Sequence, residues 1–240
     1  MGAARRLNHK MNMPSKRFKE SEQKIDKNKT HSLEEASTLV KECASTKFDE
    51  TVEMHFNVGI DTKKGDQQIR GTVSLPHGSG KKVRVAAFVD GANETVAKEA
   101  GADIVGTEET IATLVQTGKI EFDVAVAVPA MMPKLAKAAR ILGPRGLMPN
   151  PKTDTVGPNV EKMITEQKAG KVSFKNDDTA NVHVTVGKCS FEPAKLHENA
   201  TAVVEAIKKS KPSSSKGIFI KSATMTSTMG PAIKIDANNL

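Results

Sequence analysis

The sequence predicts a mixed α/β (α+β) protein in which a discontinuous α+β domain, built from both ends of the chain, carries an inserted domain. Two observations predict this fold class. Segments near both ends alternate apolar and polar residues, which is typical of antiparallel strands with one face in water. Residues 78–169 instead contain short, continuously apolar strands separated by helices, which is typical of a parallel sheet covered on both faces.

The first end of the chain predicts one helix and two strands. Ser32 and Glu35 form a capping box, and the apolar residues that follow recur at helical spacing, which indicates a helix ending near Ser45. From Thr51 the pattern changes to period two, so we expect a half-exposed strand. A second strand over residues 72–75 leads into a turn at Pro76 and Gly78.

The middle of the chain alternates predicted strands with predicted helices. The strands cover residues 83–89, 104–105 and 124–128, and the helices cover residues 93–100, 107–117, 133–141 and 159–168. Gly170 follows the last helix at the position where a left-handed residue often ends a helix. We expect residues 78–169 to form the inserted domain, joined by two chain crossings that permit hinge motion.

The segment between the last two of these helices, residues 141–155, predicts a loop of specified shape. Five of the nine residues 143–151 are Gly or Pro, which excludes a continuous helix or strand. Arg140, Arg145 and Lys152 surround this loop and suggest an anionic partner. The alternative is a tight turn packed between helices, with the charges facing water.

The last part of the chain returns to alternating strands, at residues 171–175 and 181–186 around a turn at 176–178. A long amphipathic helix covers residues 193–210, and further strands are expected at 217–221 and 232–236. Between these strands, residues 222–231 are rich in Ser and Thr and predict a flat polar strand edge whose hydroxyls could pair with ribose. The alternative is an ordinary strand with threonines on its wet face.

Positive charge is concentrated at the two ends of the chain. The net charge of +8 divides into +6 for residues 1–31, −3 for 32–77, +1 for 78–169 and +4 for 170–240. If the ends meet in the fold, they form one basic face of the kind that binds nucleic acid. The alternative is that lysine-rich ends only keep the protein soluble.

Composition argues against several other classes of protein. Cys43 and Cys189 are far apart and form no CxxC pair, and the six histidines have no metal-site spacing, so we expect reduced cysteines, no metal and no disulfide framework. No apolar run approaches a membrane span, and the basic start has no signal-peptide core, so we expect no membrane partner.

Nucleotide-binding and catalytic motifs are absent or broken. Residues 77–82, HGSGKK, resemble a phosphate loop, but a strand follows them where a helix is required. No nucleophile elbow or catalytic constellation stands out, so we expect no catalytic residue and no cofactor. With no Tyr or Trp, the chain is poor in stacking groups, and any nucleic acid it binds should be recognised by shape and backbone, as folded RNA is.

Four long motifs carry a resemblance to a known family. In chain order they are KFDETV at residues 47–52, RGTVSLP at 70–76, GPRGLMPNPK at 143–152 and TSTMGP at 226–231. Together they resemble the bacterial large-subunit ribosomal protein L1 family, which forms the ribosomal stalk, over about residues 13–236. The resemblance implies a discontinuous rRNA-binding domain, residues 1–77 and 170–240, with an inserted Rossmann-like three-layer α/β domain, residues 78–169.

The resemblance also implies a function and partners. Family members bind large-subunit rRNA to form a mobile stalk, assist movement and release of deacylated tRNA at the exit site, and repress their own operon by binding an mRNA leader. We therefore expect a cytoplasmic, non-enzymatic component of the ribosome that is monomeric off the ribosome. The alternative, an α/β nucleotide-binding enzyme, is disfavoured by the broken motifs.

Candidate RNA contacts come from two sources. The resemblance implies contacts at Lys47, Phe48, His183, Ser222, Thr228, Met229 and Gly230. Charge adds three phosphate contacts, Lys16, Arg17 and Lys188. Arg145 and Lys152 are secondary contacts, because their loop belongs to the inserted domain of net charge +1 and is first a structural element.

Three departures from the family pattern affect this interpretation. Residues 1–12 precede the usual family start, so either Met13 is the initiator or these residues form a disordered basic tail. Asp178 and Asp154 stand where basic and small residues are commoner, which puts RNA contacts carried over to either place in doubt. Thr185 occupies a common Pro position, with no functional consequence expected.

Overall fold

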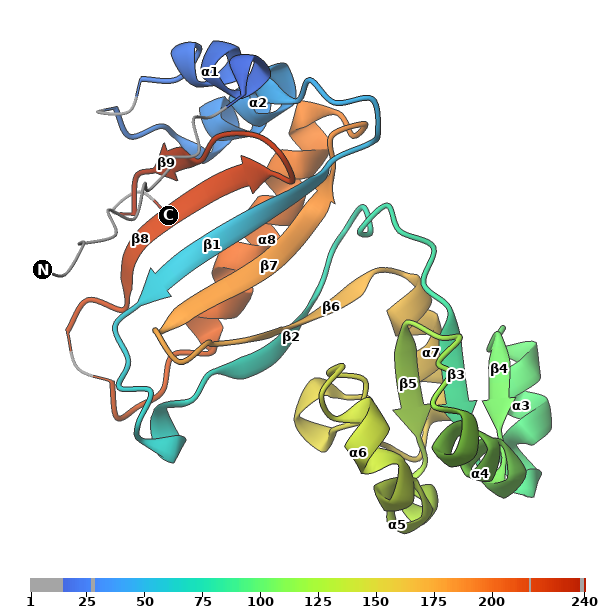
Figure 1. Ribbon diagram of the computed structural model, residues 1–240. Coiled ribbons are helices and arrows are strands. Elements are labelled where there is room, and N and C mark those ends of the chain that lie inside the picture. Colours follow the sequence, from blue (N-terminus) through green and yellow to red (C-terminus); the bar gives the residue numbers. More distant parts are fainter. Residues whose placement is uncertain (1–14, 27–28, 216, 238–239) are drawn as a thin grey trace, which may run out of the picture.

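A computed structural model describes residues 15–26, 29–215, 217–237 and 240 (Figure 1). The predicted basic tail at residues 1–12 and the start at Met13 lie outside the described residues. Within them, helices and strands mix in the way that the predicted fold class requires, and that prediction is confirmed.

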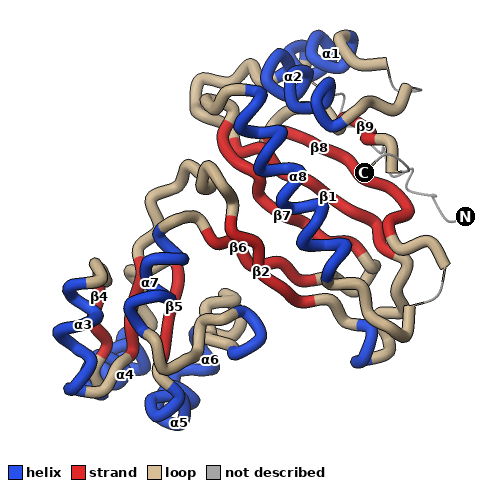
Figure 2. The backbone as a smooth tube through the Cα atoms, turned by 180° about the vertical axis from the view of Figure 1, so that it is seen from behind, coloured by secondary structure: helices blue, strands red, loops and turns tan. Residues whose placement is uncertain are grey.

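Both ends of the chain build one main body around an antiparallel sheet of order β7-β1-β8-β9 (Figure 1). These strands are β1 (Thr51–Val58), β7 (Asn181–Lys188), β8 (Ile220–Ser227) and β9 (Ile233–Ile235). One face of the sheet packs against α2 (Leu33–Cys43) and α8 (Pro193–Lys209), as Figure 2 shows from behind. Val52, Met54 and Phe56 are fully buried on that face, so the alternation predicted from Thr51 sets which side of β1 joins the core.

Local signals explain where the helices of the main body begin. The Ser32 hydroxyl accepts the backbone N–H of Glu35 at 3.2 Å, which confirms the Ser32 half of the predicted capping box, and α2 ends at Cys43. The Glu35 carboxylate instead contacts His31 at 3.2 Å and Lys29 at 3.5 Å. Pro193 opens α8 at a first-turn position, where its missing N–H costs nothing. A further helix, α1 (Lys16–Gln23), was not predicted, because Phe18 is its only large apolar residue.

The middle of the chain forms a second body around a parallel sheet of order β4-β3-β5, as predicted. Its strands are β3 (Val85–Phe88), β4 (Ile104–Gly106) and β5 (Val124–Ala127). One apolar core joins the sheet to α4 (Glu108–Thr117), α5 (Met132–Leu135) and α6 (Ala139–Leu142). A second core joins the other face to α3 (Glu94–Glu99) and α7 (Val160–Lys168), which makes three layers (Figure 1).

A two-stranded ribbon, β2 (Arg70–Ser74) with β6 (Lys171–Lys175), connects the two bodies (Figure 1). The two chain crossings pack against each other at Gly78 and Gly170, whose φ values are +68° and +103°. A Cβ added at Gly170 would lie 2.5 Å from the Gly78 Cα, so only glycine fits there. The fully buried Asn199 of α8 accepts the His77 N–H at 3.0 Å and donates to the Gly78 carbonyl at 3.1 Å. The crossing point is therefore tied to the main body.

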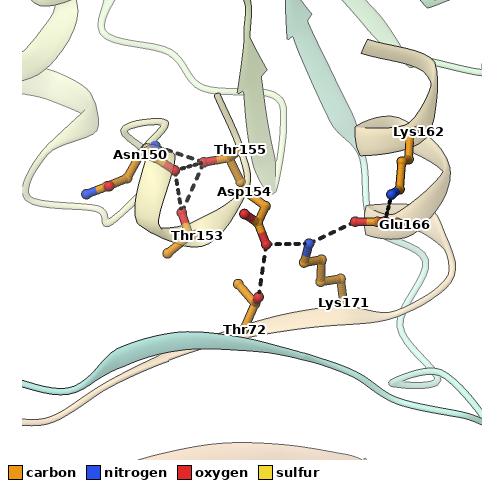
Figure 3. A network of polar contacts seen from close by, with 8 residues as sticks. All are labelled: Thr72, Asn150, Thr153, Asp154, Thr155, Lys162, Glu166 and Lys171. Atoms are coloured by element: carbon orange, nitrogen blue, oxygen red, sulfur yellow. Dashed lines mark hydrogen bonds and ion pairs between the residues drawn. The ribbon is translucent and has the colours of Figure 1, made fainter. Parts of the chain in front are cut away.

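An ionic bridge made by Lys171, Asp154 and Glu166 joins the ribbon to the middle body (Figure 3). Lys171 Nζ lies 3.0 Å from Asp154 and 2.8 Å from Glu166, and its side chain is only 8% exposed. Burial alone would lower the pKa of Lys171, but the Glu166 and Asp154 carboxylates outweigh it and raise that pKa. Thr72 of β2 also donates to Asp154, at 3.5 Å. Asp154, a departure from the family pattern, thus contacts the ribbon.

The Gly/Pro-rich segment is a shaped loop whose only regular element after α6 is a 3₁₀ turn, Pro151–Thr153. The Asn150 carbonyl accepts the Thr153 and Thr155 hydroxyls at 3.0 and 3.1 Å (Figure 3). The Asn150 side chain accepts the Lys152 N–H at 2.8 Å. Other 3₁₀ turns are Gly65–Gln67, Gly91–Asn93, Pro129–Met131 and Ala136–Ala138. The loop therefore derives its shape from internal hydrogen bonds.

Two predicted elements are wrong in detail. The helix predicted at residues 133–141 is interrupted by the 3₁₀ turn Ala136–Ala138, where the buried Leu135 and Ala138 are three residues apart, as the tighter 3₁₀ geometry favours. The strand predicted at 217–221 begins only at Ile220, because Gly217 has a φ of +85° and Ile218 is exposed. That strand instead continues through the Ser- and Thr-rich segment to Ser227.

Candidate nucleic-acid interface

The sheet face opposite α2 and α8 carries a continuous set of polar side chains, which we call the open face. Because β1 buries every second residue, Glu53, His55 and Asn57 point the other way. The register of β1 places neighbours on both sides: Thr185 and Thr226 beside Glu53, His183 and Thr224 beside His55, and Asn181 and Ser222 beside Asn57. In Figure 1, no described helix lies over this face of β1, β7 and β8.

Two histidines meet at the centre of the open face. His55 Nδ1 and His183 Nδ1 are 2.8 Å apart, so one ring N–H donates a hydrogen bond to the nitrogen of the other ring, and the ring centroids are 4.9 Å apart. Burial, and then the neighbouring His183, lower the pKa of His55. Asp177 lies 3.7 Å from His183 Nε2, on the far side of that ring. The lowered pKa favours the neutral imidazole of His55, which can exchange hydrogen bonds with a ligand on this face.

One end of the sheet holds a compact group that we call the strand-end cluster: Glu50, Thr51, Thr228, Met229 and Gly230. Thr228 Oγ1 accepts the Thr51 N–H at 3.0 Å, and the Thr228 N–H donates to the Thr51 carbonyl at 3.0 Å. Glu50, only 1% exposed, accepts the Met229 N–H at 2.9 Å. Residues 228–230 are therefore held against the start of β1.

Exposed apolar and basic groups surround the strand-end cluster. Phe48 and Met229 are 55% and 51% exposed, which is unusual for large apolar side chains and typical of a contact surface. Arg17 Nη2 donates to the Met229 carbonyl at 3.5 Å. Lys188 Nζ donates to Thr51 Oγ1 at 2.8 Å and to the Asp49 carbonyl at 3.3 Å. This end of the sheet therefore combines apolar surface with positive charge.

The structure brings most of the sequence-predicted RNA contacts to this region. Thr228, Met229, Gly230, Lys47, Phe48, Arg17 and Lys188 lie in the cluster or beside it, and Lys16 precedes Arg17 in α1. His183 and Ser222 lie further along the open face, paired with β1 at His55 and Asn57. Arg145 and Lys152 are exposed on the middle body's loop, apart from the sheet.

Sequence reasoning missed Glu50 and His55 as parts of this surface. His55 stands in the alternating pattern of β1, and that signal could have placed it on the same face as His183. Glu50 gives no local signal, because its contact with Met229 joins residues 179 positions apart.

The expectation that residues 222–231 form a strand edge is wrong. β8 is an interior strand that pairs with β1 on one side and β9 on the other. Its backbone pairs with β1 along the strand and with β9 at residues 223–225, so β8 offers hydroxyls on the open face and is not a free edge of the sheet. The alternative of threonines on a wet strand face describes β8 itself.

The middle body lacks the groups that a nucleotide site needs at the carboxyl ends of its parallel strands. That edge is where α/β proteins bind such ligands, and here it is lined by the carboxylates of Asp90, Glu94, Glu108 and Glu109 with one cation, Lys134. Carboxylates repel phosphates. The HGSGKK segment lies at the chain crossing described above, away from this edge.

Comparison with known proteins finds a family match that covers most of the chain. The model of the ribosomal protein L1p/L10e family matches residues 39–231, a range that includes Phe48, the open face and residues 228–230. The chain belongs to this family. Ribosomal L1p/L10e proteins are structural and not enzymes, so the alternative of a nucleotide-binding enzyme is set aside.

Named relatives of the L1p/L10e family cover nearly the whole chain. The large ribosomal subunit protein uL1 of Deinococcus radiodurans is 50% identical over 92% of this chain and 94% of its own length. The uL1 proteins of Corynebacterium aurimucosum and Fervidobacterium nodosum are 50% and 49% identical, over 95% and 94% of this chain and 97% and 96% of their own. Among the described residues, no helix is long and apolar enough to span a membrane, and no cluster of three or more metal-binding side chains occurs.

Proposed function

We propose that this protein binds a folded segment of large-subunit rRNA through the strand-end cluster and the open face. The observation that carries the proposal is the strand-end cluster, whose exposed Met229 contacts Arg17 and whose Thr51 contacts Lys188, with the exposed Phe48 two residues before Glu50 in the chain. Membership of the ribosomal L1p/L10e family supports an RNA partner, and relatives named as large-subunit proteins support the subunit.

The chemistry of this surface suits folded RNA. The Thr224 hydroxyl and the His55–His183 pair can exchange hydrogen bonds with ribose 2′-hydroxyls. Basic residues supply phosphate contacts, which position the RNA without reading its sequence. With no Tyr or Trp in the chain, recognition depends on backbone shape more than on base stacking.

We further propose that the two bodies have different functions. Residues 1–77 and 170–240 form the rRNA-binding domain, and residues 78–169 form a domain that moves as part of a ribosomal stalk. The exposed Arg145 and Lys152 on the Gly/Pro loop then offer charge to deacylated tRNA leaving the exit site. Neutralising both residues should weaken tRNA binding to the protein–rRNA complex and leave rRNA affinity unchanged.

The same surface also supports repression of the protein's own operon. An mRNA leader that copies the rRNA fold presents the same ribose and phosphate groups to the strand-end cluster. Such a leader should compete with rRNA for one site, so that added rRNA relieves repression of in vitro translation. An mRNA leader that binds the protein at the same time as rRNA would contradict this part of the proposal.

Titration with full-length bacterial large-subunit rRNA tests the primary assignment. We expect log affinity to fall linearly with log salt, and Arg17→Gln to reduce the slope by about one for each phosphate that the arginine neutralises. Arg145→Gln is the matched control, because it removes the same charge outside the proposed primary site. Equal effects of the two variants, or an affinity independent of salt, would contradict phosphate-led binding at the strand-end cluster.

A further inference from the structure

Glu50 is a buried acid placed directly beneath the surface assigned to RNA. It is 1% exposed, and its Oε2 accepts the Met229 N–H at 2.9 Å. Its own carbonyl accepts the Cys189 N–H at 2.9 Å, which anchors its backbone to the end of β7. The carboxylate is therefore fixed by the sheet and in turn fixes the loop above it.

The loop of residues 228–230 depends on this contact for the position of Met229. Thr228 is tied to Thr51 by backbone and hydroxyl, and the Gly230 N–H donates to the Ser227 carbonyl at 3.1 Å. A Cβ at Gly230 would lie 2.4 Å from Ser227 Oγ, so the turn is tight. Between these anchors, the backbone of Met229 contacts Glu50 through its N–H and Arg17 through its carbonyl, while its side chain is half exposed.

The charge of Glu50 opposes RNA binding in general. Burial tends to raise the pKa of Glu50, but the neighbouring Ser227 side chain and the Met229 N–H outweigh burial and hold that pKa below its ordinary value. The side chain is therefore an anion at neutral pH, close to a surface that receives phosphates. An anion there weakens every phosphate contact, specific or not, whereas its bond to Met229 helps only an RNA that fits the loop.

We propose that Glu50 is a positioning residue that makes binding selective for folded RNA: its carboxylate holds the Met229 amide in place and penalises indiscriminate phosphate contacts. Specificity is a difference between two affinities, and a repulsive element can contribute to it as much as an attractive one. This inference rests on the proposed rRNA function. It adds to the site a buried residue, Glu50, that acts through the backbone of the exposed Met229.

The experiment compares affinities for full-length bacterial large-subunit rRNA and for polyuridylate in the full-length protein. Glu50→Gln keeps an oxygen that can accept the Met229 N–H but removes the charge that strengthens this bond, so it should weaken rRNA binding by about tenfold, while polyuridylate binding stays constant or tightens. Glu50→Asp keeps the charge but is one methylene too short to reach Met229, so it should weaken rRNA binding without tightening polyuridylate binding. Hydrogen exchange at the Met229 amide should accelerate in both variants.

Asp49→Asn is the matched control. Asp49 is the exposed neighbour of Glu50, and its carboxylate accepts hydrogen bonds from the Ser190 N–H at 3.0 Å and hydroxyl at 2.9 Å. Removing this charge should tighten the binding of both RNAs by the same factor and leave the ratio of the rRNA affinity to the polyuridylate affinity unchanged. If Glu50→Gln does not fold, Glu50→Asp and its Met229 exchange rate decide the question.

Two outcomes separate this inference from the function beneath it. A wild-type protein that binds rRNA no better than polyuridylate would overturn the proposed function. A wild-type protein that prefers rRNA, with the same preference kept in Glu50→Gln and Glu50→Asp, would overturn only the role of Glu50.

Discussion

Replacing Lys171 with Met removes the cation of the ionic bridge and keeps most of the apolar length of the side chain. Asp154 and Glu166 lie 3.0 and 2.8 Å from Lys171 Nζ, so the substitution leaves Asp154 without this cation and leaves Glu166 with only the more exposed Lys162, 3.8 Å away. Because Lys171 lies on the ribbon and both acids lie in the middle body, the substitution removes a contact that holds the two bodies together. We expect lower stability and a wider range of angles between the bodies.

The magnitude follows from the exposure of the three side chains. Exposed ion pairs contribute about 0–1 kcal/mol each, whereas removing one partner of a buried pair costs about 3–5 kcal/mol. Here Lys171 is 8% exposed, but Glu166 and Asp154 are 33% and 63% exposed, so an intermediate cost applies. We expect Lys171→Met to cost about 2 kcal/mol, which lowers Tm by about 4–8 °C in a chain of this size.

Asp154→Gly provides a contrast within the same bridge. It removes one ion pair, worth about 1 kcal/mol, but also relieves a non-glycine residue at φ +49°, which costs about 1 kcal/mol. The free energy of unfolding should therefore change little. Thermal unfolding followed by circular dichroism measures stability, and small-angle X-ray scattering measures the spread of the two bodies, which should increase in both variants.

Two results would refute this reasoning. The first is a Lys171→Met protein with the melting temperature and scattering curve of the wild type, which would mean that the ionic bridge neither stabilises the protein nor restricts the two bodies. The second is an Asp154→Gly protein destabilised by about 1 kcal/mol, the full value of the ion pair, which would mean that the left-handed conformation at residue 154 carries no cost.

Three further predictions concern other parts of the molecule. Gly170→Ala should move the chain crossing apart, because its Cβ would meet Gly78 Cα at 2.5 Å, and scattering should show altered placement of the bodies with each core intact. The Asn181 backbone N–H is the main cause that lowers the pKa of Asp177 to about 2, so the stabilisation from this carboxylate is present above about pH 4 and is lost as pH falls toward 2. In Asp177→Asn, the free energy of unfolding should depend less on pH between about 4 and 2. A pH dependence equal to that of the wild type would contradict this prediction. Thr228→Val should weaken rRNA binding by about 1–3 kcal/mol, and because its hydroxyl accepts the Thr51 N–H it should also cost about 1 kcal/mol of stability; calorimetric titration with unchanged affinity would remove Thr228 from the site.

The predicted elements succeeded where the signal was local. The cap at Ser32, the alternation of β1 and the apolar strands of the middle body follow from backbone chemistry and from which side chains can enter a core. They failed where a neighbour distant in sequence decides the outcome. Nothing near residue 136 announces the break between α5 and α6, and α1 has too few apolar residues to be recognised before it packs near Cys43 through Ser21.

For the candidate site too, the sequence predicted some features and the tertiary structure decided others. Phe48, Thr228 and Met229 were identified because they stand in long motifs that resemble a family. The motifs did not reveal that these residues meet at one end of a sheet, or that the hydroxyl-rich strand lies inside that sheet. Periodicity shows that a strand has a wet face but not which strands lie beside it, because strand order depends on the packing of the whole core.

By itself, the sequence determined the fold class, the family and the chemistry available to this protein, because capping, alternation and composition act over a few residues. Only the tertiary structure decided which groups meet. It brought Glu50 into contact with Met229, 179 positions away, and His55 into contact with His183, 128 positions away. It also placed Lys171 of the ribbon between two acids of the middle body. Such contacts form when cores and chain crossings pack, and no local pattern encodes them.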